Sequence, residues 1–128
     1  VGVETAVTGT VLAVRDGVVQ VEVAGRILTS ALADDQSPDV GAAVVVCIRA
    51  EDVSLQSRRS DAVTSQRNQL DVTVTQVSVE GALVRVELDA GFRLSSYVTR
   101  PAREDLGIVD GARLVATFKG QAVHLVPR

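Results

Sequence analysis

The stretch DVGAAVVVCIRAEDVSL, Asp39 to Leu55, returns later in the chain as VDGARLVATFKGQAVHL, Val109 to Leu125. The two segments align without a gap, and the identical positions are a glycine, an alanine, two valines and a leucine. In both segments an apolar run ends in a cation, Arg49 in the first and Lys119 in the second. Because an internal repeat fixes the architecture of a chain, the sequence predicts two copies of one small module.

A hairpin pattern precedes each repeated segment. The turn dipeptide Asp16-Gly17 leads into VVQVEV, and Glu80-Gly81 leads into ALVRVEL. Valines at every second position are typical of strands, and valine favours strands through its branched Cβ. Each half then holds about five short strands. We predict an all-β fold of two tandem small OB-like five-stranded barrels, because closure removes exposed sheet edges.

One segment of the second half breaks the strand pattern. The stretch RPAREDLG, residues 100–107, has Pro101 where a first helical turn tolerates proline and Gly107 where a helix can end. We predict one short helix here, in the second barrel. The predicted organisation is a first module over residues 1–57, a polar linker over 58–66 and a second module over 67–128.

The composition excludes several classes of function. A net charge of −3, from 13 basic and 16 acidic residues, argues against a protein that attracts nucleic acid through its bulk charge. No apolar run approaches the roughly 20 residues needed to span a bilayer, and no signal peptide is visible. We therefore expect a cytoplasmic protein without membrane insertion. The chain has no methionine and begins with Val1, so we expect a fragment of a longer chain or a processed one.

Three strand residues carry expectations about their surroundings. Cys47 is the single cysteine, which excludes an internal disulfide, and within the run AAVVVCI it is expected to be buried and inert. Glu22 and Glu87 occupy matching positions of the repeat and alternate with core valines. Both carboxylates are therefore expected to point into solvent.

The polar stretch TSQRNQL, residues 64–70, stands where the second module begins. Its residues Ser65, Gln66, Arg67 and Asn68 offer a hydroxyl, two amides, a guanidinium and four consecutive backbone N–H groups. Successive N–H groups can converge on an anion, and arginine adds charge-assisted hydrogen bonds. Composition alone favours a solvated linker over an anion site, because polar stretches of this kind between modules are usually linkers.

The first half lacks this chemistry. Its counterpart of residues 65–68 is Gly2-Val3-Glu4-Thr5, which sets Glu4 against Arg67. A carboxylate at that position would repel an oxyanion. Of the two modules, the second is therefore the better candidate for an anion site, and the first is expected to be mainly structural.

These motifs together resemble a known family. The segments TSQRNQL, VEGALVRVELDAGFRLSSYVTR, EDLG and FKGQAVHLV resemble the molybdenum-pterin-binding (Mop) module. The first half, which ends in CIRAEDVSL, resembles the transport-associated OB (TOBE) segment at the C-terminus of ABC-transporter ATPase subunits; the Arg-Pro-Glu-Asp pattern of that family reads Arg49-Ala50-Glu51-Asp52 here. The chain is thus similar to the C-terminal regulatory domain of a molybdate or tungstate importer's ATP-binding subunit.

The resemblance implies an oxyanion site between modules or chains. The Ser-Ala-Arg-Asn stretch of the Mop module matches this chain except that Gln66 replaces the alanine, and the two small residues after the family's lysine are Gly120 and Gln121 here. The turn residues Glu80, Gly81 and Ala82 fall where the backbone of another chain would approach in that family. The implied oxyanion-binding residues are Ser65, Gln66, Arg67, Asn68, Gly81, Ala82 and Lys119.

The leading expectation is a regulatory domain that binds molybdate or tungstate and adjusts an ABC importer to the intracellular oxyanion level. Its expected partners are further copies of itself, joined as a dimer or higher oligomer through the barrels, an upstream ATPase domain and membrane permease subunits. The chain has no GxxxxGK[ST] phosphate-binding loop, so we do not expect it to hydrolyse ATP itself.

Two other functions stay open. One is a stand-alone tandem-Mop protein that stores or buffers molybdate, and the other is a ligand-free scaffold that holds ATPase subunits together. An enzyme is disfavoured, because the only histidine, His124, has no second catalytic group at a recognisable spacing. We expect no catalytic residue and no metal site.

Overall fold

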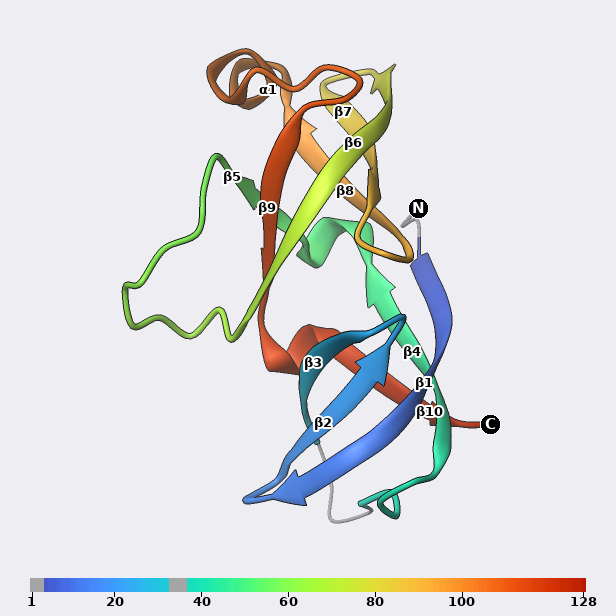
Figure 1. Cartoon of the computed structure of the whole chain (residues 1–128). Coiled ribbons are helices and arrows are strands. Elements are labelled where there is room, and N and C mark those ends of the chain that lie inside the picture. Colours follow the sequence, from blue (N-terminus) through green and yellow to red (C-terminus); the bar gives the residue numbers. More distant parts are fainter. Residues whose placement is uncertain (1–3, 33–36) are drawn as a thin grey trace.

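Two five-stranded antiparallel sheets, each curled into a half-barrel, lie end to end in the computed structural model, which describes residues 4–32 and 37–128 (Figure 1). The elements in chain order are β1 (Glu4–Arg15), β2 (Val18–Val23), β3 (Arg26–Ala31), β4 (Ala43–Arg49), the 3-10 turn η1 (Ala50–Asp52), β5 (Ser54–Gln56), β6 (Asn68–Glu80), β7 (Leu83–Asp89), β8 (Arg93–Thr99), the helix α1 (Arg100–Leu106), β9 (Arg113–Phe118), the 3-10 turn η2 (Gly120–Ala122) and β10 (Val123–Pro127). This architecture confirms the predicted all-β fold with two OB-like barrels.

The repeat seen in the sequence is a repeat of structure. The order β4, η1, β5 in the first half matches β9, η2, β10 in the second half at the spacing of the sequence alignment. Gly41 and Gly111, which precede β4 and β9, have φ angles of 87° and 86°, which are left-handed conformations that glycine adopts without strain. Each donates its N–H to a long strand, Gly41 to Val11 O at 2.7 Å and Gly111 to Val74 O at 2.8 Å.

The helix α1 is the predicted one and has the predicted ends. Thr99 accepts a hydrogen bond from Ala102 N at its start, and Pro101 lies in the first turn, where its missing N–H costs nothing. Gly107 ends the helix in a left-handed conformation with φ 63°. With seven residues, α1 is the only α-helix within residues 4–32 and 37–128, and no helix there could cross a membrane.

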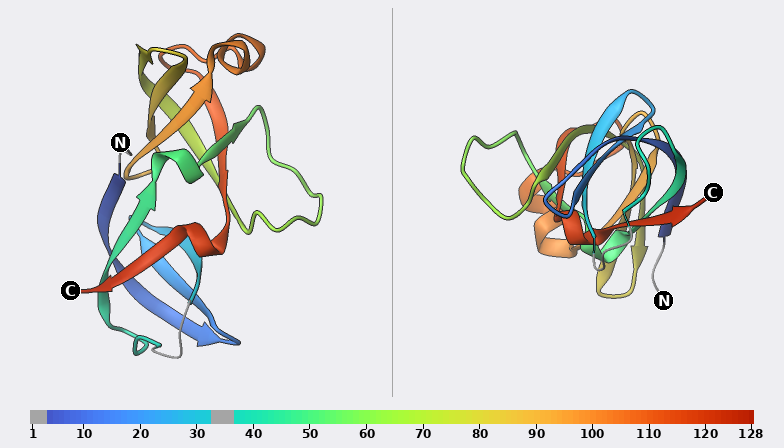
Figure 2. Two further views of the ribbon diagram at one scale, coloured as in Figure 1. Left: turned by 180° about the vertical axis from the view of Figure 1, so that it is seen from behind. Right: turned by 90° about the horizontal axis from the view of Figure 1, so that it is seen from below.

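The two barrels exchange their last strands. The first sheet has the order β10-β4-β1-β2-β3 and the second the order β5-β9-β6-β7-β8. The chain crosses from one barrel to the other through η1 and back through η2, as the two red and green crossings in Figures 1 and 2 show. Each sheet is therefore built from both halves of the chain, although the predicted modules were continuous in sequence. The boundaries 1–57, 58–66 and 67–128 stay a prediction.

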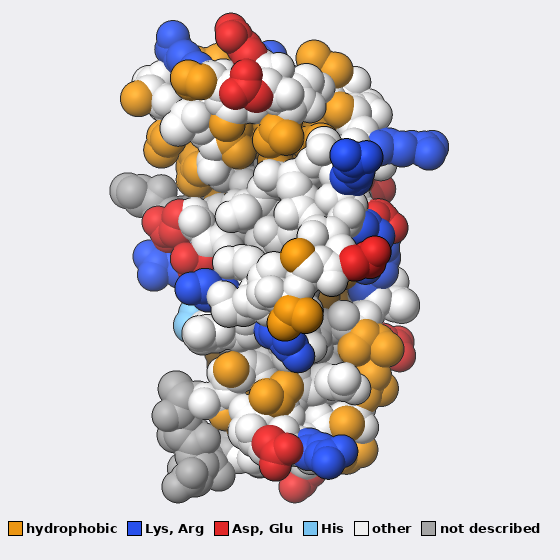
Figure 3. All heavy atoms as spheres, turned by 90° about the vertical axis from the view of Figure 1, so that its left-hand side faces the viewer, with side chains coloured by type: hydrophobic (Ala, Val, Ile, Leu, Met, Phe, Trp, Pro, Cys, Tyr) orange, Lys and Arg blue, Asp and Glu red, His pale blue; other side chains and the backbone are white. Residues whose placement is uncertain are grey.

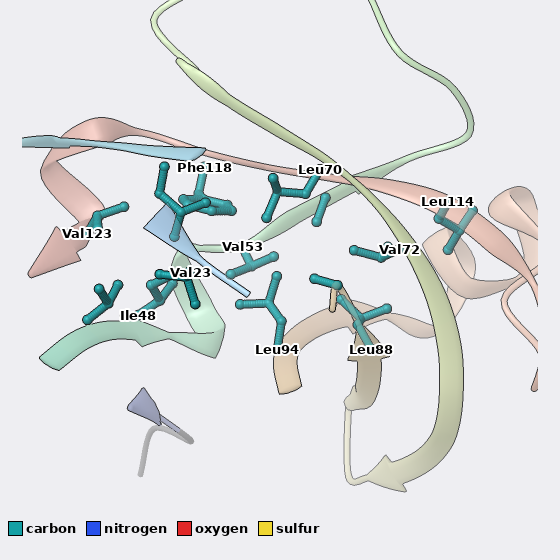
Figure 4. Packing of buried hydrophobic residues seen from close by; sticks show 14 of the residues in the cluster. Val23, Ile48, Val53, Leu70, Val72, Leu88, Leu94, Leu114, Phe118 and Val123 are labelled. Atoms are coloured by element: carbon teal, nitrogen blue, oxygen red, sulfur yellow. The ribbon is translucent and has the colours of Figure 1, made fainter. Parts of the chain in front are cut away.

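A single core runs through both barrels. Phe118, Ile48, Val53, Val123 and Leu94 are each at most 3% exposed and belong to one buried cluster (Figure 4). Val53 and Val123 begin the exchanged segments after η1 and η2, so each supplies core to the barrel that its own half does not form. Burial of the two small barrels against each other supplies the area that neither has alone.

Two serines hold the exchanged segments by equivalent hydrogen bonds. The Ser30 hydroxyl of β3 donates to Val123 O at 2.6 Å, and the Ser96 hydroxyl of β8 donates to Val53 O at 2.6 Å. Both serines are buried. Each bond satisfies a buried carbonyl at a strand that arrives from the other half of the chain.

Two expectations about side-chain surroundings were wrong. Cys47 is half-exposed on the outer face of β4, between Ala6 of β1 and His124 of β10. Partial burial, followed by the charge of Glu4 and a hydrogen bond with it, raises the pKa of the thiol, which disfavours the reactive thiolate. Glu87 is 4% exposed, whereas Glu22 is exposed as expected.

Glu87 is buried because the outer face of the second sheet provides partners for it. Its carboxylate accepts hydrogen bonds from Ser95 Oγ at 2.8 Å and Arg93 Nε at 3.1 Å, and Arg85 Nε lies 3.4 Å away. Burial raises the pKa of Glu87, but the hydrogen bonds from Arg93 and Ser95 and the charges of Arg93 and Arg85 together lower it below its usual value. The carboxylate is therefore held ionised.

Candidate anion-binding site

The first residue of β6, Asn68, connects the two barrels. Asn68 is 3% exposed and pairs with Phe118 of β9. Its Oδ1 accepts a hydrogen bond from Thr29 N at 2.8 Å, and its Nδ2 donates to Thr29 O at 2.9 Å and to Phe118 O at 3.4 Å. The side-chain amide is thus occupied within the chain, so Asn68 positions the preceding residues.

Arg67 and Lys119 flank the end of the same strand pair. The β6–β9 ladder ends at Asn68 and Phe118, and in an antiparallel pair the next opposed residues are Arg67 and Lys119. Both side chains are exposed. Neither forms an ion pair with any carboxylate in the described part of the chain. Two uncompensated cations at one strand end create a positive potential that favours an anion.

The equivalent place in the first barrel is electrically balanced. Glu4 of β1 pairs with Arg49 of β4, where the second barrel has Arg67 and Lys119. Arg49 also forms an ion pair with Glu51, with 2.8 Å between Nε and Oε1. Of the two equivalent places, the one in the second half has two cations, and the anion site there stays a prediction.

Ser65 and Gln66 directly precede Arg67 in the chain. The N–H of Gln66 donates to Thr64 Oγ1 at 2.9 Å, so this backbone donor is occupied. The side chain is half-buried, and its Oε1 is buried without a hydrogen-bond partner among the described residues. Rotation of the side-chain amide of Gln66 by 180° would place Nε2 where Oε1 now lies. Nε2 could then donate a hydrogen bond to an anion. Ser65 is exposed, with its hydroxyl directed by no partner within the described chain.

Gly120 permits a close contact inside the chain. It is buried, and a Cβ built on it would lie 3.4 Å from Ala31 N and 3.6 Å from Thr29 O. The backbone of η2 therefore packs directly on β3, the strand that also holds Asn68. We call residues 65–68 and 119 the junction site, because Asn68 and η2 fix both of its segments against β3.

Gly81 and Ala82 lie far from the junction site in the same chain. They form the turn between β6 and β7, where Arg100 Nη2 donates to Gly81 O at 2.9 Å. The 13 residues of β6 separate this turn from Asn68, which corresponds to roughly 40 Å along an extended strand. One chain thus brings together five of the seven predicted residues.

Sequence reasoning missed Thr29, which holds the side chain of Asn68. No local pattern marks it, because the two residues are 39 positions apart.

His124 is exposed on β10 beside Cys47. Within residues 4–32 and 37–128, no three His, Cys, Asp or Glu side chains gather as a metal site would require. On the side where the linker projects, Lys and Arg side chains are scattered from one end of the molecule to the other, with acidic groups beside several of them (Figure 3).

The comparison with protein families decides how this half of the chain is classified. Residues 64–125 match the family model of the TOBE domain. This part of the chain is similar to TOBE domains. The match covers the half that resembles the Mop module, and it includes the whole junction site from Ser65 to Lys119.

The chain has relatives among transport proteins. The molybdate/tungstate import ATP-binding protein WtpC of Pyrococcus horikoshii is 34% identical over 105 residues, which cover 80% of this chain and 30% of the relative. The protein of the same name from Pyrococcus abyssi is 33% identical over 83 residues, which cover 64% of this chain and 24% of the relative. The chain therefore spans less than a third of the length of these relatives.

A solved structure resembles the chain over its full length. The cytoplasmic molybdate-binding protein ModG, crystallised with molybdate bound, is 27% identical and superimposes with a TM-score of 0.86. The match covers 97% of this chain and 96% of ModG. Both barrels, and not residues 64–125 alone, therefore share their arrangement with ModG.

Proposed function

We propose that this chain is an oxyanion-binding regulatory domain of an ABC importer ATPase, with molybdate or tungstate as its ligand. The observation that carries the proposal is that Arg67 and Lys119, two cations without an ion pair among the described residues, adjoin Asn68 and Phe118, the last pair of the β6–β9 ladder. Its counterpart in the first barrel, Glu4 opposite Arg49, is neutral overall. The similarity to WtpC and ModG supports the same ligand class.

The chemistry of the junction site fits a tetrahedral dianion. Arg67 would donate charge-assisted hydrogen bonds, and Lys119 would add a second charge. The hydroxyl of Ser65 and the amide of Gln66 would supply neutral donors. Asn68 would act as a positioning residue through Thr29. Molybdate and tungstate have nearly the same size and charge, so the proposal covers both.

A second copy of the chain would complete the site. Gly81 and Ala82 stand at the far end of β6, so only another copy can bring its turn to the junction site. Their backbone N–H groups and small side chains suit close approach to an anion. The proposal therefore includes a homo-oligomer, a dimer or larger, whose formation and oxyanion binding are coupled.

Calorimetric titration of the purified chain tests this function. Molybdate and tungstate should release or absorb heat on binding, whereas phosphate and sulfate should bind more weakly. Arg67→Ala and Lys119→Ala should each weaken molybdate binding by about tenfold or more, the size expected for one charge-assisted contact. Arg49→Ala is the matched control, because Arg49 holds the equivalent place in the neutral barrel.

The outcome distinguishes this function from the scaffold. Binding by the parent chain and by Arg49→Ala, with loss in the other two variants, supports the junction site. If both junction variants bind molybdate as the parent does, the residue assignment is wrong. An absence of heat with all four anions at high protein concentration would leave the ligand-free scaffold.

A stand-alone storage or buffering protein is the second candidate. The coverage of 97% of this chain and 96% of ModG favours it, since ModG is itself a molybdate-binding protein of this size. An immunoblot of the source cells separates the two. A band near 13.4 kDa supports storage, and a band of an ATPase subunit's mass supports the regulatory domain.

The regulatory proposal includes the setting of the parent protein. An ATPase domain elsewhere in the parent chain and permease subunits in the membrane would be its partners, on the cytoplasmic side. The domain itself would act by binding and would not hydrolyse ATP. Regulation then requires the oxyanion to bind one arrangement of the ATPase subunits more tightly than another.

A further inference from the structure

A second basic surface lies outside the junction site, on the outer face of β6 and β9. A groove of about 650 Å³ is lined there by four arginines and two aspartates. The charged residues of this groove are Arg26, Arg58, Arg59, Arg113, Asp71 and Asp89. We call it the arginine groove.

The arginine groove is assembled from three separate parts of the fold. Arg113 of β9 pairs with Thr73 of β6 on the floor of the groove. Arg58 and Arg59 come from the segment that leaves β5. Arg26 belongs to β3 of the other barrel, and its Nη2 donates to Asp71 O at 3.2 Å. The exchanged strand β5 pairs with β9 and so brings Arg58 and Arg59, which follow it, to this part of the second sheet.

The charges in the groove are only partly compensated. Asp71 forms an ion pair with Arg59 at 3.6 Å, while Asp89 Oδ1 accepts a hydrogen bond from Gly91 N at 2.8 Å. Arg58 and Arg113 form no ion pair with any carboxylate that the structure describes. Four guanidinium groups against two carboxylates leave two positive charges in excess, on a chain whose net charge is −3.

The fold does not require this cluster. In the first barrel the pair equivalent to Thr73 and Arg113 is Thr10 and Ala43. The barrel thus forms with an uncharged residue at the position of Arg113. The stability of the fold therefore gives no reason for Arg113, and an exposed ion pair such as that of Arg59 with Asp71 contributes little to folding.

We propose that the arginine groove binds a polyvalent phosphate-type anion, such as a diphosphate or a triphosphate group. Guanidinium groups match phosphate oxygens in a bidentate geometry, and their origin in three segments suits a ligand with more than one anionic centre. The groove is open, so binding depends strongly on salt. This proposal is independent of the oxyanion proposed for the junction site.

Titration of the full chain with pyrophosphate, orthophosphate and ATP, without magnesium, tests the groove by backbone amide chemical shifts. Pyrophosphate should shift the amides of residues 57–59, 71–73 and 113–115 and should bind more tightly than orthophosphate. Tighter binding of ATP than of pyrophosphate identifies a nucleotide as the source of the phosphates. Tighter binding of pyrophosphate identifies a free polyanion. Either result supports the groove.

Variants of the charged residues give opposite expected effects. The double variant Arg58→Gln/Arg113→Gln should weaken pyrophosphate at least about tenfold, and Asp71→Asn should tighten it several-fold by removing a negative charge. Amide shifts at residues 57–59, 71–73 and 113–115 that are larger than those at residues 65–68 and 119 separate this groove from the junction site. Arg15→Gln, on the distant β1–β2 hairpin, is the matched control.

Three results would overturn the proposal. They are an absence of binding at low salt, equal affinities for orthophosphate and pyrophosphate, and unchanged affinity in both the double variant and Asp71→Asn. The aspartate variant keeps the test decisive if the double variant does not fold.

Discussion

The side-chain amide of Asn68 hydrogen-bonds both backbone groups of Thr29, with 2.8 Å from Thr29 N to Oδ1 and 2.9 Å from Nδ2 to Thr29 O. Thr29 belongs to β3, an edge strand of the first sheet, and Asn68 begins β6 of the second. The side chain of Asn68, in the second sheet, thus satisfies backbone groups at the edge of the first sheet as a neighbouring strand would. It fixes the chain immediately after Arg67, so it sets the direction in which the junction site faces.

Replacement of Asn68 by alanine should destabilise the whole chain. The change leaves the N–H and C=O of Thr29 without their partner in a partly buried place, which costs about 2–4 kcal/mol. Urea denaturation followed by circular dichroism measures this loss. Thr5→Ala is the matched control at the equivalent position of the first barrel and should cost under about 1 kcal/mol. Equal losses in the two variants would contradict the role given to Asn68.

Separate expression of residues 1–57 and 58–128 should give two polypeptides that do not fold alone. The first fragment lacks β10, so the edge of β4 stays exposed and the core of its barrel lacks Val123. The second fragment lacks β5 and the core residue Val53. Mixed in equal amounts, the two should fold together, since every contact of the intact chain is then available. Amide spectra of each fragment and of the mixture measure this. A well-dispersed spectrum from either fragment alone would contradict the exchange of strands.

Glu87 should make stability depend on pH in the acid range. The folded-state pKa of Glu87 is lowered from the usual value of 4.5. Its stabilising effect is therefore complete above about pH 5 and is lost as pH falls through the folded-state pKa. Glu87→Gln should flatten this part of the stability curve. Because Arg93 is mostly exposed, the loss at neutral pH should be only about 1–2 kcal/mol. Thermal unfolding from pH 3 to 7 measures both effects, with Glu22→Gln as the exposed control; identical curves for the two variants would refute the assignment.

Gly9 should not accept a side chain. A Cβ there would lie 2.6 Å from Val21 Cγ1 and 2.9 Å from Glu22 O, so the strand or its neighbour must shift. Gly9→Ala should therefore destabilise by about 1–3 kcal/mol, as overpacking does, even though alanine suits a strand better than glycine. Urea denaturation compares it with Thr10→Ala on the same strand, which is exposed. A gain in stability from Gly9→Ala would show that β1 can move away from β2.

The sequence predicted the architecture because the repeat is carried by local signals. Valine alternation, the glycines at positions 41 and 111 and the proline and glycine around α1 each act within a few residues, and all of them appear in the structure as expected. The exchange of β5 and β10 has no such signal, because either barrel offers the same strand edge to the same pattern. The packing of Val53 and Val123 in the opposite barrel, and the hydrogen bonds that Ser30 and Ser96 make to their carbonyls, hold the exchanged arrangement.

The candidate site was predictable in its charges and not in its contacts. The opposition of Arg67 and Lys119 follows from the repeat and from the strand register. The engagement of Asn68 by Thr29 depends on how the barrels meet, which no pattern encodes. Glu87 was misjudged for the same reason: alternation places its side chain outward, and only the arrangement of Arg93 and Ser95 covers it.

The three-residue crossings η1 and η2 fix the number of residues between β4 and β5 and between β9 and β10. One residue added between β4 and β5, or between β9 and β10, would turn the face of the exchanged strand that packs in the core toward solvent. Residues added near Asp61 to Val63, between the arginine groove and the junction site, would enlarge a surface loop at a small entropic cost. Length variation among relatives should therefore collect in that loop and be absent from the two crossings, which makes the crossings the most dependable anchor for aligning distant members of the family.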